Sequence, residues 1–267
     1  MHQTPKITPT FEELVADLPQ RSDGASPSGH AAFKQLRPQL LQHLDDAAAA
    51  RAPEVTTALS FWTRNNDHIR AIERLTTRAE LSDHFDEAYP ELVLQFPNAG
   101  DKDRWLDRKI AEAQGPSTIL KETWPQAPLL KPGVLGRGGV MPTIDFDVMF
   151  KVDEPVTWPA PAAMTVEADF VPLHFVWKNW TYHSKRGARS QDLTAYVLRI
   201  EDEDDIGVRG HWVARIDPPS PRDPNFEWQA EIVTAPGLRF EVTRVEDLGA
   251  RWGRLCRVHA KLRPPLA

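Results

Sequence analysis

Cysteine is nearly absent from this sequence. The 267 residues contain a single cysteine, Cys256. One cysteine excludes an internal disulfide, a zinc site built from several cysteines and a cysteine-ligated cluster. A chain that needs no disulfide is compatible with a reducing compartment, so we expect a cytoplasmic protein.

Long apolar runs and a signal-like beginning are also absent. The stretch MHQTPKITPTFEELVADLPQ lacks a basic segment followed by an apolar run, and nowhere do about 18 apolar residues follow one another. We therefore expect a soluble protein that makes no membrane contact.

Positive charge is not in excess. The formal net charge is −6 at pH 7 and the sequence pI is near 5.9. This balance argues against a protein that coats nucleic acid through its overall charge. Any contact with nucleic acid or phosphate would have to be local.

The short motifs of common cofactor and catalytic sites are missing. The sequence has no P-loop ending, no glycine-rich dinucleotide signature, no GxSxG elbow and no HExxH. We therefore expect no cofactor. The loop LGRGG (Leu135 to Gly139) could turn backbone N–H groups toward an anion, but its glycines are more simply read as a hinge into a strand.

What is present is a change of hydrophobic period along the chain. Apolar residues recur at helical spacing in the first part and alternate in the last part. We predict an α+β fold, with an N-terminal helical region followed by an antiparallel β-sandwich or barrel of about seven strands. The expected parts are an N-terminal arm (1–29), a helical region (30–115), a proline- and glycine-rich linker (116–139) and an antiparallel β domain (140–267).

Individual elements follow from the same patterns. We expect helices over 31–52, 55–75 and 101–114, and a capping box at Thr77 and Glu80 opens another. The alternating segments predict strands at Val140 to Val152, Met164 to Trp180, Leu193 to Ile200, Gly207 to Ile216, Phe226 to Thr234, Leu238 to Val245 and Leu255 to Leu262.

Two aspartates stand out in the first of these strands. In IDFDVMFKV, Asp145 and Asp147 project to the same side of an extended chain and could share divalent cations, as in two-metal phosphoryl transfer. The alternative is that they form the solvent-facing side of an amphipathic strand, which the alternation alone explains.

The words DFDVMFK (Asp145 to Lys151) resemble the acidic strand of cyclic GMP-AMP synthase and related nucleotidyltransferases. The resemblance implies metal ligation by Asp145 and Asp147. Magnesium or manganese would suit such a site, and a later acid such as Glu231 or Glu241 would complete it.

The most unusual surface segment is VWKNWTYHSKRGARSQD (Val176 to Asp192), in which aromatic and basic residues alternate. Such a surface can stack on bases, grip phosphates or anchor a protein partner. The alternative is that its tryptophans point into the core. Its candidate binding residues are Trp177, Lys178, Trp180, Tyr182, His183, Lys185, Arg186 and Arg189.

The resulting functional prediction is a non-enzymatic binding or assembly protein that uses this basic-aromatic loop to contact a protein partner or another copy of itself. One alternative is a metal-dependent phosphoryl- or nucleotidyl-transfer enzyme or nuclease at Asp145 and Asp147. A second is a small-molecule-binding β-barrel, which would account for the nine tryptophans.

Overall fold

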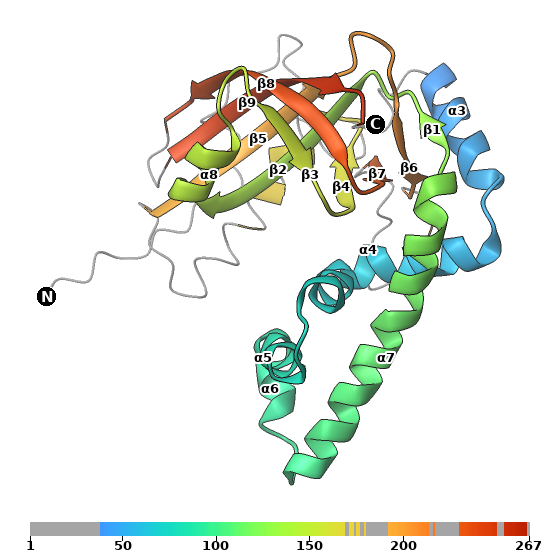
Figure 1. Cartoon of the computed structure of the whole chain (residues 1–267), viewed down its shortest axis with the longest axis vertical. Coiled ribbons are helices and arrows are strands. Elements are labelled where there is room, and N and C mark those ends of the chain that lie inside the picture. Colours follow the sequence, from blue (N-terminus) through green and yellow to red (C-terminus); the bar gives the residue numbers. More distant parts are fainter. Residues whose placement is uncertain are drawn as a thin grey trace, which may run out of the picture. The chain divides into compact units, whose positions relative to one another are not determined.

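The computed structural model describes residues 38–168, 171–173, 175–176, 179, 192–213, 216, 230–249 and 254–265. The chain forms two compact units (Figure 1): one contains α3 and the strands, and the other contains α4 to α7. Across the described ranges, no helix combines the length and apolar character that crossing a membrane requires.

The helical unit confirms the predicted N-terminal helical region. It consists of α4 (Pro53–Arg74), α5 (Arg78–Ala88), α6 (Pro90–Val93) and α7 (Ala99–Thr123), followed by a 3-10 turn (Trp124–Gln126). The capping box is present, because the Thr77 hydroxyl accepts from the Glu80 N–H while the Glu80 carboxylate accepts from the Thr77 N–H. Helix α7 runs through Pro116, so the first part of the predicted linker is helical.

Aromatic side chains form the core between α5 and α7. Phe85, Trp105 and Leu106 are buried, and Tyr89, Phe96 and Ile110 pack against them. The ring of Trp105 meets Phe85 and Tyr89 edge-on, with ring centroids 6.1 and 5.6 Å away. This cluster fixes α5 on α7.

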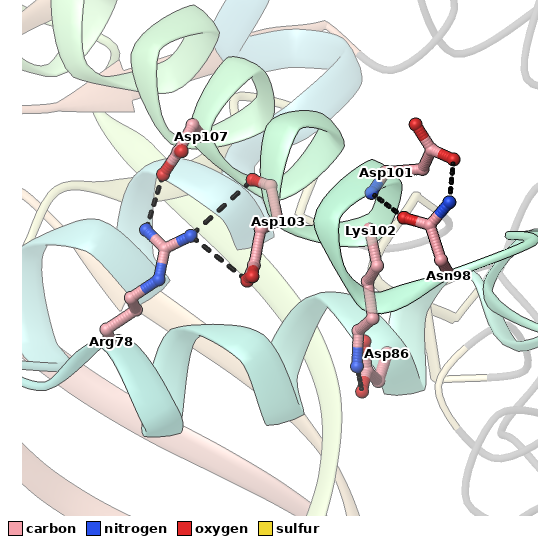
Figure 2. Close-up of polar contacts among 7 residues, drawn as sticks. All are labelled: Arg78, Asp86, Asn98, Asp101, Lys102, Asp103 and Asp107. Carbon is pink, nitrogen blue, oxygen red and sulfur yellow. Dashed lines mark hydrogen bonds and ion pairs between the residues drawn. The ribbon is translucent and has the colours of Figure 1, made fainter.

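Ion pairs also connect these two helices (Figure 2). Arg78 at the start of α5 donates to Asp107 and, at 3.3 Å, to Asp103, while Lys102 pairs with Asp86 near the other end of α5. The N-cap of α7 is Asn98, whose side chain accepts from the Asp101 N–H.

The second unit is built around one nine-stranded sheet. Its strand order is β1-β6-β7-β4-β2-β5-β9-β8-β3. Strands β5 and β9 are parallel and the other neighbours are antiparallel, so the sheet is mixed. The strands are β1 (Leu129–Leu130), β2 (Val134–Pro142), β3 (Pro155–Trp158), β4 (Ala162–Thr165), β5 (Leu193–Glu201), β6 (Val208–Trp212), β7 (Glu231–Thr234), β8 (Leu238–Asp247) and β9 (Arg254–Arg263).

The α+β class is therefore correct, but the antiparallel seven-stranded sandwich or barrel is wrong. Strands β1 and β3 are the two edges of the sheet, so it is not closed. This unit also contains α3 (Pro38–Ala49), which is tied to β6 by a 3.1 Å hydrogen bond from Trp212 to Asp45, and α8 (Thr143–Met149), which packs on β2 and β5.

Two of the predicted strands are also corrected. The segment Val140 to Val152 contains the end of β2 and then α8, which buries Phe146 on its inner side. Phe146 and Phe150 stand four residues apart and both contact the Tyr196 ring, a spacing that suits one face of a helix. In the segment Met164 to Trp180 the strand stops at Thr165, and residues 171–173 and 175–176 are helical.

Candidate functional site

The sheet opens between β2 and β4. Strand β2 pairs with β5 along its whole length, from Val134 to Pro142, but it pairs with β4 at one position, Gly136 opposite Thr165. Two strands that pair at a single position diverge beyond it. We call this place the β2–β4 fork.

Arg137 lies at the fork, next to the single paired position. Its Nη1 donates to the backbone oxygen of Ala163 on β4 at 2.7 Å, and its guanidinium lies 5.2 Å from the ring centroid of Trp158. An arginine carries five N–H donors, and the Ala163 contact uses one of them. The half-buried guanidinium is thus held by a carbonyl and an aromatic face, with further donors available to a ligand.

Glycines beside Arg137 let another segment approach the strand closely. A Cβ at Gly138 would lie 1.6 Å from the carbonyl oxygen of Pro172, and a Cβ at Gly136 would lie 2.7 Å from the Cα of Ala168. The backbone that follows β4 therefore rests directly on β2. This segment covers the β2 face that carries these two glycines.

Hydrogen bonds to side chains fix the start of this segment. The Thr165 hydroxyl accepts from the Glu167 N–H at 3.0 Å, and the buried Glu167 carboxylate accepts from the Val171 N–H at 2.8 Å. Both side chains are almost fully enclosed, so they hold the turn after β4 in one conformation.

Glu231 completes the arrangement on the far side of β4. The sheet register aligns Gly136, Thr165 and Glu231 in one row across β2, β4 and β7. At about 5 Å for each step between strands, the Cα of Glu231 lies about 10 Å from the Cα of Gly136 on β2. Paired residues in a row point to the same face, so Glu231 shares the face of Thr165 and Gly136, whereas Arg137, the next residue of β2, points to the other face.

The backbone holds Glu231 from both sides. The preceding residue, Ala230, has φ of +45°, a left-handed conformation that non-glycine residues seldom adopt. Its carbonyl accepts from the Val166 N–H at 3.0 Å, and the Glu231 carbonyl accepts from the Val213 N–H at 3.0 Å. Backbone strain at a single residue, when the surrounding structure enforces it, is common at functional sites.

A guanidinium and a carboxylate suit a ligand that is anionic in one part and develops positive charge in another. Arginine binds phosphate groups through two parallel hydrogen bonds. A carboxylate stabilises positive charge at a sugar carbon during glycosidic cleavage. The fork therefore combines two groups that a phosphorylated sugar substrate requires.

The predicted aspartate pair lies elsewhere, on α8. Two residues apart on a helix, Asp145 and Asp147 project about 200° from each other, so they do not share a face as they would on a strand. Asp147 accepts from Arg254 of β9 at 2.6 Å, and this hydrogen bond raises the pKa of Arg254. The structure thus pairs Asp147 with a cation rather than with Asp145.

The two later acids are not brought together either. Glu241 on β8 pairs with Arg263 at 3.0 Å, and four strands separate β8 from β7, which carries Glu231. Among the residues that the structure describes, no three His, Cys, Asp or Glu side chains are grouped to hold a metal ion. Cys256 is buried, and burial raises its pKa to about 11.

The basic-aromatic segment falls outside the described residues. This applies to every candidate binding residue named for it: Trp177, Lys178, Trp180, Tyr182, His183, Lys185, Arg186 and Arg189. Their role stays a prediction.

Sequence reasoning missed Arg137. It stands in LGRGG, where the glycines suggested a hinge. The available signal was a lone arginine flanked by glycines at the start of the β-rich part, since glycine within a strand often marks the close approach of another backbone or of a ligand.

Comparisons with known proteins bear on the fold. No protein-family model matches the sequence, and no curated protein matches it. The Vis toxin, an ADP-ribosyltransferase from Vibrio splendidus, superposes with a TM-score of 0.51 at 11% identity over 96% of this chain and 91% of that one. ADP-ribosyltransferase Vis in complex with the M6 inhibitor gives a TM-score of 0.53 at 13% identity over 94% and 90%.

A further match is Plx2a, an ADP-ribosyltransferase toxin from Paenibacillus larvae, with a TM-score of 0.45 at 12% identity over 88% of this chain and 96% of that one. At identities this low, structural similarity indicates a shared fold and no more. We base the fold similarity on the two Vis structures.

These likenesses correct the functional prediction. The proteins that share the fold are enzymes, so the prediction of a non-enzymatic binding or assembly protein is wrong. The open sheet contradicts the small-molecule-binding β-barrel. The hypothesis of a metal-dependent transfer enzyme loses its basis, because the two aspartates expected to share a strand face lie on a helix.

Proposed function

We propose that this chain is an ADP-ribosyltransferase, an enzyme that breaks the bond between nicotinamide and ribose in NAD⁺ and transfers the ADP-ribosyl group to an acceptor. The observation that carries the proposal is the fold likeness to ADP-ribosyltransferase Vis, which extends over 94% to 96% of this chain. The residue types near the fork, an arginine on β2 and a glutamate on β7, also suit the chemistry that this reaction needs.

The reaction begins with cleavage of the bond between the nicotinamide nitrogen and C1′ of the ribose. The electron pair of that bond leaves with nicotinamide, which becomes neutral, and C1′ takes on positive charge shared with the ring oxygen. We assign Glu231 the stabilisation of this charge, because a carboxylate fixed beforehand needs no reorganisation as the charge develops.

Transfer then requires a nucleophile from the acceptor. As its lone pair forms the new bond to C1′, the nucleophile loses a proton, which a nearby carboxylate can accept. We assign this step to Glu231 as well. If water takes the acceptor's place, the products are nicotinamide and free ADP-ribose.

Arg137 is the residue we assign to the diphosphate of NAD⁺. Its guanidinium is oriented by the Ala163 carbonyl and the Trp158 ring before any ligand binds. A cation held in this way loses little conformational entropy on binding.

The test is release of nicotinamide from NAD⁺ by the purified chain, together with transfer of labelled ADP-ribose to proteins of a cell extract. We expect Glu231→Gln to lower the rate of nicotinamide release by about 100-fold or more, because it removes the charge that stabilises C1′. The matched control is Glu241→Gln, another half-buried strand glutamate, whose carboxylate pairs with Arg263.

The control should retain full activity. A wild-type protein that neither binds NAD⁺ nor releases nicotinamide would overturn the proposed function. Equal activity of Glu231→Gln and wild type would instead remove Glu231 from the mechanism while leaving the reaction in place.

A further inference from the structure

A buried histidine lies between α4 and α5 in the helical unit. His68 of α4 is 9% exposed. Its Nδ1 lies 3.4 Å from Nε2 of His84 on α5, and its Nε2 lies 2.7 Å from the hydroxyl of Tyr89, the residue that ends α5. The His68 ring also packs on Phe85 with centroids 4.7 Å apart. Both of its nitrogens thus contact side chains at the C-terminal half of α5.

The contact between the two imidazoles limits how many protons the pair can hold. A hydrogen bond between two ring nitrogens needs one N–H and one lone pair. When both rings are neutral, or when one is protonated, such an arrangement exists. When both are protonated, two N–H groups and two positive charges face each other at this separation, and the contact is lost.

The surroundings of His68 disfavour its charged form. Burial lowers the pKa of His68, and His84 on α5 lowers it further. On α4 itself Asp67 raises the pKa, and on α7 Lys109 lowers it while Glu112 raises it. The largest cause is burial, which follows from the packing of this ring against Phe85.

The other attachment of α5 contains no histidine. Arg78 and Lys102 pair with carboxylates across the α5–α7 contact, as Figure 2 shows. Among ionisable side chains, histidine is the one whose ordinary charge change falls between pH 5 and 8. These ion pairs therefore survive at pH 5 to 6, where histidines become charged.

We propose that the His68–His84 contact is an acid-sensitive latch between α4 and α5, which opens in mildly acidic solution while α5 stays attached to α7. The latch is independent of the proposed transferase activity, because all its residues lie in the helical unit. Its opening would separate α4 from the C-terminal half of α5 and expose the side of the Phe85 ring that packs on His68.

The direction of the pH effect follows from proton uptake. His68 binds a proton less readily in the closed state than in an open one, so the open state holds more protons below pH about 6.5. The stability of the closed state is therefore fully present above this pH and falls as the pH drops toward the lowered pKa. Each proton taken up on opening changes the opening equilibrium by about tenfold per pH unit in this range.

Hydrogen exchange of the full chain at pH 7.5 and pH 5.5, corrected for the intrinsic pH dependence of exchange, tests the latch. In the wild type we expect amide protection in the last two turns of α5 to fall by about tenfold at the lower pH, with protection in the middle of α7 retained. In His84→Gln the loss should be smaller, because no second positive charge then faces a protonated His68 and the introduced amide can turn its oxygen toward it; the part caused by burial of His68 remains.

The control is His43→Gln, which changes an exposed histidine of α3 and should behave like the wild type. Protection of α5 that does not change between the two pH values in the wild type would overturn the proposal. So would a loss of protection in His84→Gln as large as that in the wild type. Because His84 is only half buried, this variant is expected to fold.

Discussion

Gly138 illustrates at the residue scale how tightly the proposed site is packed. Replacing Gly138 by alanine would place a Cβ 1.6 Å from the carbonyl oxygen of Pro172, so one of the two backbones must move. We expect Gly138→Ala to lower the free energy of unfolding by about 3 kcal/mol or more. Urea denaturation followed by circular dichroism measures the change.

The matched control is Gly115→Ala. Gly115 lies within α7, and a Cβ there has no neighbour within 4 Å. Alanine favours a helix interior over glycine, but a Cβ just before Pro116 meets the proline ring, so this variant should stay within about 1 kcal/mol of the wild type. If Gly138→Ala is as stable as the wild type, the close contact between β2 and the segment that follows β4 is not present in solution.

Individual site residues were only partly predictable from the sequence. Glu231 was named as an acid that could complete a site, but as the partner of Asp145 and Asp147 rather than of Arg137. The register of β2, β4 and β7 brings Glu231 into line with Gly136, the neighbour of Arg137, and those strands are far apart in the chain. No spacing within the sequence encodes such pairing.

The N-terminus of α5 provides a prediction at the element scale. Thr77 and Glu80 satisfy each other's backbone N–H groups, and the Thr76 N–H also donates to the Glu80 carboxylate at 3.1 Å. Hydrogen bonds to Thr77 and Thr76 lower the pKa of Glu80. We expect Thr77→Ala to destabilise the helical unit by about 1 kcal/mol.

Thr76→Ala is the control for this change. Thr76 is equally exposed and contributes its backbone rather than its side chain to the cap, so its replacement should stay within about 0.5 kcal/mol of the wild type. Hydrogen exchange of the α5 amides locates the effect. Equal losses in the two variants would mean that the cap does not limit the stability of α5.

Elements whose signals are local were predictable, and elements set by distant contacts were not. The capping box opens α5 as expected, because its two partners are three residues apart. Helix α8 was read as a strand because a seven-residue helix leaves few turns in which to display its period, while Phe146, Val148 and Phe150 happen to alternate with other residues. The parallel pairing of β5 with β9 depends on segments about 60 residues apart.

Binding of NAD⁺ by the whole molecule gives a further prediction. A ligand that binds the folded state alone stabilises it, by about 2.7 kcal/mol at a concentration 100 times its dissociation constant. We expect NAD⁺ to raise the thermal midpoint of the wild type and of Glu231→Gln, because that variant keeps the diphosphate contact. In Arg137→Ala the shift should be largely lost.

Differential scanning fluorimetry across a series of NAD⁺ concentrations measures these shifts, with Arg199→Ala as a control for the loss of a strand arginine. An unchanged shift in Arg137→Ala would exclude Arg137 from the binding site. The cytoplasmic location and a protein or self-assembly partner stay predictions at this scale.

The position of β9 has a consequence for how the protein is made. This strand lies inside the sheet, between β5 and β8, although among the described strands it is synthesised after all the others. During translation β5 and β8 would emerge from the ribosome with a gap between them and with exposed edges that no neighbour covers. The sheet, and with it the support behind β2, can close only after residue 263 has left the exit tunnel. A chain that stalls shortly before that point would have made Arg137 and Glu231 without the central strand that completes their scaffold.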